Sequence, residues 1–158
     1  MLSGDVNPSG KLPFTFPVEM SDGPVFNEEQ YPGIQREGEN IIDEYYSEGV
    51  FVGYRWYDTK NVKPLFAFGH GLSYTTFEYG EASVKGRKLS VSVKNTGELA
   101  GAEVVQLYIS DTDSSVERPA KELKGFKKVF LQPGESAKIT FDIPDEALSF
   151  FDADAHKW

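Results

Sequence analysis

The feature that most constrains the fold is a series of short alternating runs that begins at about residue 78. In the segment KLSVSVKNTG, Leu89, Val91 and Val93 alternate with polar residues, and the run ends in an Asn-Thr-Gly turn. The runs AEVVQLYIS, KELKGFKKVFL and SAKITFDIP follow, with a Gln-Pro-Gly-Glu turn between the last two. A period of two without an intervening amphipathic helix is typical of strands that bury one face. The sequence therefore predicts a mainly β protein built as an antiparallel β-sandwich.

The segments before residue 78 have a different composition. Residues 1–33 are dense in proline and glycine, and the run at 12–17 can form only a short edge strand, because its two prolines lack N–H groups. Residues 34–63 are acidic and rich in tyrosine, which is typical of a solvated loop face. Aromatic and β-branched residues at 50–54 nevertheless predict one strand there. We expect these irregular segments to pack against something larger, since they cannot close a core.

Composition excludes several classes of function. The formal net charge of −9 repels a phosphate backbone, so we expect no nucleic-acid partner. The chain has no cysteine and only two histidines, without a metal-ligand spacing, so we expect no metal and no cofactor. It has no long apolar run and no export signal, so we expect no membrane partner. The compartment stays undetermined.

His70, set between two glycines in FGHGLSY, could be a catalyst, a ligand or a structural residue. A Gly-x-Ser-x-Gly nucleophile motif is absent, and no pair of carboxylates stands out as a glycosidase pair. Glycines on both sides permit a sharp turn and a close backbone approach. This favours a structural His70, and the sequence predicts no catalytic residue within the chain.

Seven blocks in a fixed order carry a resemblance to a known family. They are NPSGKLPFTFP, YPG, YSEGVFVGYRWYD, PLFAFGHGLSYTTFEY, VKNTGELAGAEVVQLYISD, RPAKELKGFKKVFLQPGESAKITFDI and LSFFD. Together they resemble the C-terminal portion of glycoside hydrolase family 3, the β-glucosidase and β-xylosidase type. The resemblance implies that residues 1–33 are the end of an α/β sandwich domain and 34–77 an interdomain connector. Residues 78–158 would then be an immunoglobulin-like, fibronectin type III-like domain that lacks its last strand.

The resemblance also implies an activity for a longer parent protein. Family members place the nucleophilic Asp on a barrel domain and the acid/base Glu on the α/β sandwich, and neither segment has a counterpart here. The parent would hydrolyse terminal β-linked glucosides or xylosides, while the 158-residue chain alone would be inactive. Its partners would be the missing barrel and α/β sandwich domains, with the oligosaccharide substrate bound by them. A polysaccharide-degrading parent favours a periplasmic or secreted location.

Two interpretations of the aromatic residues remain open. In the first, the resemblance places Phe66, Phe68, His70 and Tyr74 at the entry to the β-sandwich, where they would pack one domain on another. In the second, the chain is a non-catalytic carbohydrate-binding or structural module, and exposed rings stack on sugars. The candidate rings for stacking are Tyr54, Trp56 and Tyr57, with Tyr45 and Tyr46 beside them. Packing is the favoured interpretation.

Overall fold

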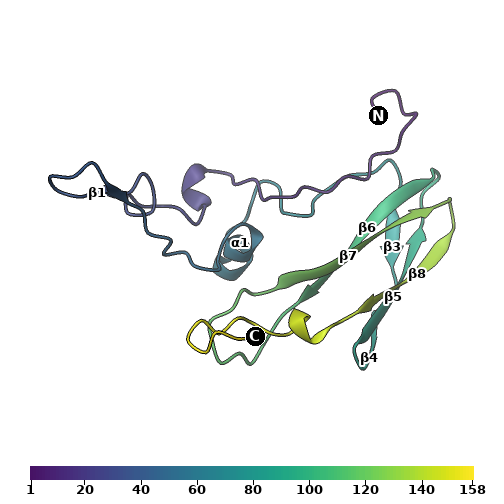
Figure 1. Ribbon diagram of the computed structural model, residues 1–158. Coiled ribbons are helices and arrows are strands. Elements are labelled where there is room, and N and C mark those ends of the chain that lie inside the picture. Colours follow the sequence, from purple (N-terminus) through teal and green to yellow (C-terminus); the bar gives the residue numbers. More distant parts are fainter. The chain divides into compact units, whose positions relative to one another are not determined.

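A computed structural model describes residues 1–158 and divides them into two compact units. Figure 1 traces the chain through both. The chain passes from one unit to the other after residues 11, 70, 109 and 122. Unit 1 comprises Met1–Lys11, Gly71–Ile109 and Leu123–Trp158, and unit 2 comprises Leu12–His70 and Ser110–Glu122.

The first sheet of unit 1 is organised around β5 (Lys88–Asn95). Strand β8 (Ser136–Asp142) pairs antiparallel with β5 along almost its whole length, with Val91 opposite Ile139. Strands β3 (Phe77–Tyr79) and β4 (Ser83–Lys85) also pair antiparallel with β5, at its two ends. Because β8 occupies one edge of β5, β3 and β4 share the other edge.

The second sheet of unit 1 consists of β6 (Gly101–Ile109) and β7 (Glu122–Leu131), which lie beside each other in Figure 1. Apolar residues of both sheets form the core between them, as the alternating runs predict. The core side chains are Val91, Val93, Val105, Leu107, Leu131, Ile139 and Phe141. This two-layered arrangement confirms the predicted antiparallel β-sandwich. The unit also contains the short 3-10 helix η2 (Asp145–Ala147).

The turn between β7 and β8 has the residues that its geometry requires. Pro133 precedes Gly134, which has a φ of 76°. A positive φ after proline is the pattern of a type II turn and favours glycine. The Glu135 N–H donates to the carbonyl of Gln132 at 3.0 Å, and a Glu135 carboxylate oxygen accepts from the Gln132 N–H at 2.7 Å. The predicted Gln-Pro-Gly-Glu turn is therefore confirmed.

Asn95, at the end of β5, is a fully buried polar residue in this apolar sandwich. Its Oδ1 accepts hydrogen bonds from the Thr75 hydroxyl at 2.7 Å and from the Gly97 N–H at 3.1 Å. Its Nδ2 donates to the carbonyls of Leu99 at 2.8 Å and Leu131 at 3.0 Å. Every side-chain donor and acceptor site of the amide is thereby used, which is what a buried amide requires.

Unit 2 contains little regular structure. Its elements are η1 (Met20–Asp22), the short antiparallel pair β1 (Ile34–Gln35) and β2 (Ile42–Asp43), and the helix α1 (Tyr54–Lys60). Many of its large apolar side chains are exposed. None of the helices in the structure is both long and apolar enough to cross a membrane.

The strand predicted at residues 50–54 is wrong, because this stretch leads into α1 instead. Gly53, directly before the helix, has a φ of 54°, a backbone conformation that a β-strand does not adopt. At the other end, Asn61 adopts a left-handed conformation and donates its N–H to the carbonyl of Tyr57. The run at 12–17 forms a single antiparallel bridge, Phe16 to Phe66, which agrees with the restriction that its prolines impose.

We expect replacement of Asn95 by leucine to destabilise unit 1. The substitution leaves four polar groups without the amide, and each buried unsatisfied group costs about 1–3 kcal/mol. The free energy of unfolding should fall by at least about 2 kcal/mol, as measured by urea denaturation with circular dichroism. Thr96→Ala, one residue along, removes only the two exposed hydrogen bonds of the Thr96 hydroxyl with Thr76 and is the control, with a change below about 0.5 kcal/mol. Equal changes in the two variants would contradict the central role of Asn95.

Candidate functional site

His70 lies at the end of a short ladder in unit 2. The Leu12 N–H donates to the His70 carbonyl and the Gly69 N–H to the Leu12 carbonyl, both at 2.8 Å. The Phe66 ring lies 5.4 Å from the His70 ring and 6.2 Å from the Phe16 ring, measured between centroids. The rings of Phe66 and His70 therefore lie together, and the backbone carbonyl of His70 joins this segment to Leu12.

The aromatic residues of α1 are placed on different neighbours. The Tyr54 ring stacks on Phe68 with 4.8 Å between centroids. Trp56 stacks on Phe26 at 5.9 Å, and its indole N–H donates to the carbonyl of Asp22 at 2.9 Å. Tyr57 is only 6% exposed. These contacts give three of the predicted stacking residues a place in the packing of unit 2, and their role toward a sugar stays a prediction.

Burial also affects the phenol of Tyr57. Removal from water disfavours the charged phenolate and raises the pKa of Tyr57, and the nearby Asp22 carboxylate adds to the effect. The phenolate form of Tyr57 is therefore even less favoured than that of an exposed tyrosine.

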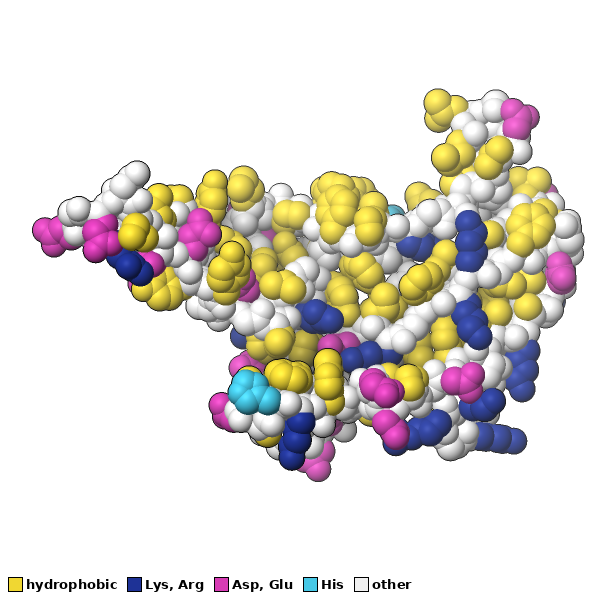
Figure 2. Space-filling model, in the orientation of Figure 1, with side chains coloured by type: hydrophobic (Ala, Val, Ile, Leu, Met, Phe, Trp, Pro, Cys, Tyr) yellow, Lys and Arg dark blue, Asp and Glu magenta, His cyan; other side chains and the backbone are white.

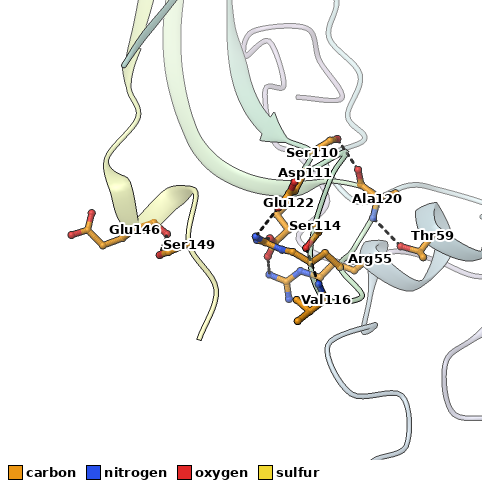
Figure 3. A network of polar contacts seen from close by, with 11 residues as sticks. Arg55, Thr59, Ser110, Asp111, Ser114, Val116, Ala120, Glu122, Glu146 and Ser149 are labelled. Carbon is orange, nitrogen blue, oxygen red and sulfur yellow. Dashed lines mark hydrogen bonds and ion pairs between the residues drawn. The ribbon is translucent and has the colours of Figure 1, made fainter. Parts of the chain in front are cut away.

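A network of charged side chains connects the loop at 110–122 with α1 inside unit 2 (Figure 3). Arg118 donates to a Glu122 carboxylate oxygen at 2.6 Å, with the two side chains only 11% and 17% exposed. The Arg118 guanidinium also lies 3.6 Å from Asp111, and Arg55 of α1 lies 3.6 Å from the other oxygen of Glu122. Because the charges of Arg118 and Glu122 are mostly shielded from water, each depends on the other for stabilisation.

Two further contacts fasten the same loop to α1. The Ala120 N–H donates to the Thr59 hydroxyl at 3.0 Å, and Lys121 lies 3.2 Å from Asp58. The Ser110 hydroxyl donates to the Ala120 carbonyl at 2.6 Å, which draws together the two ends of the loop. The loop is thus held along its length, although it connects two strands of the sandwich in sequence.

In unit 1, Asn7 binds the segment that precedes β3. Its Oδ1 accepts from the Ser73 hydroxyl and from the Tyr74 N–H, both at 2.9 Å, and its Nδ2 donates to the Ala100 carbonyl at 2.9 Å. The Tyr74 hydroxyl donates to the Met1 carbonyl at 3.0 Å. Tyr74 therefore lies in unit 1, whereas Phe66, Phe68 and His70 lie in unit 2. The predicted role of these four residues between domains is a proposal for the parent protein.

An ion pair strengthens this attachment of the first eleven residues. The Lys11 ammonium lies 3.1 Å from Glu103 of β6, with the side chains 18% and 13% exposed. The other oxygen of Glu103 accepts from the Tyr79 hydroxyl at 3.0 Å. Burial, together with the Glu103 carboxylate, raises the pKa of Tyr79 well above its ordinary value.

The structure contains no cluster of three or more His, Asp or Glu side chains that could hold a metal ion. One carboxyl has a shifted acidity, because the hydrogen bonds and the charge of Arg36 lower the pKa of Asp43. A glycosidase acid must instead be protonated near neutral pH, which requires a raised pKa. Asp43 therefore cannot serve as such an acid.

Sequence reasoning missed the polar residues that hold these segments. The partner of Lys11 is 92 residues away along the chain, so no local pattern signals the pair. Asn7 in the Asn-Pro-Ser-Gly stretch has the composition of an ordinary turn. Arg118 and Glu122 are oppositely charged and four residues apart, which was only a weak signal of an ion pair.

Comparison with known proteins places this fold among those of glycoside hydrolases. A model described as the glycosyl hydrolase family 3 C-terminal domain matches residues 1–54, and one described as a fibronectin type III-like domain matches residues 103–158. The chain is 50% identical to the beta-glucosidase BoGH3A of Bacteroides ovatus, over 100% of this chain and 22% of the relative. It is 49% identical to thermostable beta-glucosidase B of Acetivibrio thermocellus, over 100% of this chain and 21% of the relative.

Solved structures agree with these matches. DesR, a beta-glucosidase from Streptomyces venezuelae, is similar with a TM-score of 0.89 and 41% identity, over 99% of this chain and 20% of that chain. A beta-glucosidase of Bifidobacterium adolescentis gives a TM-score of 0.88 and 40% identity, over 100% of this chain and 23% of that chain. The chain belongs to glycoside hydrolase family 3 and corresponds to the C-terminal part of its members. It spans about a fifth of the length of the curated relatives it matches.

The raised pKa of Tyr79 predicts a loss of stability in alkali. Above about pH 10 the unfolded state loses the phenol proton while the folded state keeps it. The folded state then binds more protons, so the free energy of unfolding falls as the pH rises. Tyr79→Phe should make the fall between pH 9.5 and about 11 less steep in denaturation experiments at several pH values. Tyr46→Phe, at an exposed position, is the control and should leave the slope unchanged.

The network around Glu122 predicts a local effect on the loop at 110–122. Glu122→Gln removes the charge that compensates the largely buried Arg118, at a cost of about 1–3 kcal/mol. The Ala120 amide should then exchange its hydrogen at least about fivefold faster, because the opening of the loop is favoured. Glu117→Gln changes an exposed carboxylate in the same loop and should leave the exchange unaltered. An unchanged rate in Glu122→Gln would mean that the ion pair does not hold the loop.

Proposed function

We propose that these 158 residues belong to a longer protein that hydrolyses terminal β-linked glucosides or xylosides, and that they support and pack its catalytic domains. One observation carries the proposal. The whole chain matches proteins named beta-glucosidases at 50% and 49% identity, while it spans only about a fifth of their length. Most of such a protein, including room for a catalytic centre, then lies in other segments.

The domain assignment that fits this function has three parts. Residues 1–33 are the end of an α/β sandwich domain, 34–77 are a connector, and 78–158 are the fibronectin type III-like domain. A barrel and the rest of the α/β sandwich bind the oligosaccharide. Phe66, Phe68, His70 and Tyr74 then pack these domains together, which is consistent with the exposure of Phe66 and Tyr74 in the chain by itself.

The proposed reaction is a retaining double displacement. One carboxylate forms a covalent glycosyl intermediate, and a second carboxyl group protonates the leaving oxygen and then activates water. In this proposal both groups belong to the catalytic domains, and the 158 residues move no proton. The net charge of −9 argues against nucleic acid as a further partner.

The proposal predicts that the purified 158-residue chain is inactive and that the parent protein is active. Aryl β-glucosides and β-xylosides are the substrates to use, since release of the aryl alcohol is measured directly. We expect turnover by the parent and only the buffer rate for the chain. Turnover by the chain that is abolished by replacing one of its own carboxylates would overturn the proposal, and so would a parent protein without activity on either substrate.

A further inference from the structure

We propose that a groove beside η1 in unit 2 is the docking site for an apolar segment of the parent protein that carries a lysine or an arginine and lies outside these 158 residues. This inference rests on the proposed function, because it takes the chain to be one part of a longer protein. It goes further by naming the surface, the residues that form it and the chemistry of the segment that it fits.

The groove is formed by residues between 17 and 31 and has a volume of about 610 Å³. All of these residues belong to unit 2. The lining is mainly apolar, and three of its large side chains are mostly exposed, Met20 at 93%, Tyr31 at 71% and Phe26 at 62%. Figure 2 shows hydrophobic side chains gathered at the surface over the segment around η1. Large apolar side chains that gather in one place, rather than occurring singly, mark an interaction site.

Gln30 fixes the loop that forms one wall of the groove. Its side chain is buried, and its Nε2 donates to the Pro24 carbonyl and to a Glu48 carboxylate oxygen, both at 2.9 Å. Its Oε1 accepts from the Phe26 N–H at 3.1 Å, and its own N–H donates to Oδ1 of Asn27 at 2.9 Å. The loop at 24–30 is therefore ordered before any partner binds. A surface of this kind loses little conformational entropy on docking.

The ring of Phe26 is also held in place. It stacks on Trp56 with 5.9 Å between centroids, and the Trp56 indole N–H donates in turn to the Asp22 carbonyl at 2.9 Å. One face of the Phe26 ring is therefore covered within unit 2, although most of the residue is exposed. An aromatic ring that is supported on one face and open on the other is suited to anchor a side chain of a partner.

One charged group lines the groove. Glu28 is exposed, and its carboxylate makes no hydrogen bond or ion pair within the chain. No lysine or arginine is among the lining residues. A carboxylate that a partner covers needs a cation or strong donors in place of its water. The segment that docks here should therefore carry a lysine or an arginine beside its apolar side chains.

A second copy and a sugar fit the groove less well. In a symmetric contact the groove would meet the same surface of the copy, which supplies no cation for Glu28. A sugar ring has hydroxyl groups around its edge, and the side chains of Pro17, Pro24 and Val25 would leave some of them unpaired.

A part of the parent protein outside the chain is the occupant that the observations favour. The relatives are about five times as long as the chain, so most of such a protein is available to cover the groove. The groove also lies within the residues that match the family 3 C-terminal domain model.

Cysteine labelling tests the proposal, because the 158 residues contain no cysteine. Met20→Cys reports on the groove, and Lys85→Cys, at an exposed position at the end of β4, is the control. Each variant is made in the parent protein and in the 158-residue chain, and is labelled with a maleimide. Mass spectrometry of the modified peptide gives the rate, which is divided by the rate in denaturant.

We expect the thiol of Met20→Cys to react at least about tenfold more slowly in the parent than in the 158-residue chain, because the docked segment must open first. The thiol of Lys85→Cys should react at similar rates in both. Equal rates of Met20→Cys in the two proteins would overturn the proposal. Equal slowing of both thiols in the parent would also overturn it, because the protection would not be particular to the groove.

The same measurements identify the other occupants. Slow labelling of Met20→Cys in the 158-residue chain that becomes faster on dilution would show that a second copy fills the groove. Slow labelling that dilution does not change would show that the chain itself covers it, and slowing that requires added cello-oligosaccharide would show a sugar site. Each of these results would overturn the proposal.

A charge reversal tests the basic nature of the docked segment. Glu28→Lys in the parent that carries Met20→Cys should raise the labelling rate several-fold, while Glu37→Lys, the same change at an exposed position between β1 and β2, should not. Equal effects of the two substitutions would overturn the basic segment. Hydrolysis of aryl β-glycosides by the same parent is measured separately. Protection of the Met20→Cys thiol in an inactive parent would remove the proposed enzymatic function and leave the docking site intact.

Discussion

The hydrogen bonds of Asn95 hold together the parts of unit 1 that the hydrophobic core alone cannot fix in register. Apolar contacts between two sheets are non-directional, so they tolerate small shifts of one strand against another. The amide of Asn95 is directional, and it binds Thr75 before β3, Leu99 before β6 and Leu131 at the end of β7. Its backbone joins the turn after β7 as well, through Gly134 and Glu135. The residues before β3, the loop before β6 and the end of β7 therefore share one buried side chain, while the turn after β7 is held by the backbone of the same residue.

The rest of unit 1 is built outward from this end of the sandwich. Segment 1–11 lies against β6 and the residues before β3, through Asn7 and Lys11. Two glycines allow this close approach, since a Cβ at Gly71 would lie 2.1 Å from the Gly10 carbonyl and one at Gly101 would lie 2.7 Å from the Asn7 amide. A segment matched by the family 3 C-terminal domain model is thus part of the same compact unit as the β-sandwich.

The sequence was informative wherever local chemistry determines the structure. Strands β5 to β8 were predictable because their apolar residues alternate, and the turn after β7 because Pro133 and Gly134 suit its backbone. Helix α1 was not, since its aromatic residues favour strands and its ends depend on the left-handed backbone of Asn61 and on Gly53. The ion pairs of Lys11 with Glu103 and of Arg118 with Asp111 were not predictable either, because only the fold brings these charges close together. The exposure of Phe126 and Phe130 on β7 could not be predicted from the sequence and required the structure.

The chain passes four times between its two units, and this limits how either unit could be separated from the other. Each unit is assembled from separate stretches of sequence, so no single cut yields either unit intact. A recombination event within residues 12–122 would divide both units and leave each with unmatched hydrogen-bonding groups. Unlike a β-sandwich joined by one linker, this one cannot be separated intact by a cut at a single position in the sequence. A transfer that keeps both units intact must include the whole stretch of sequence over which their segments alternate.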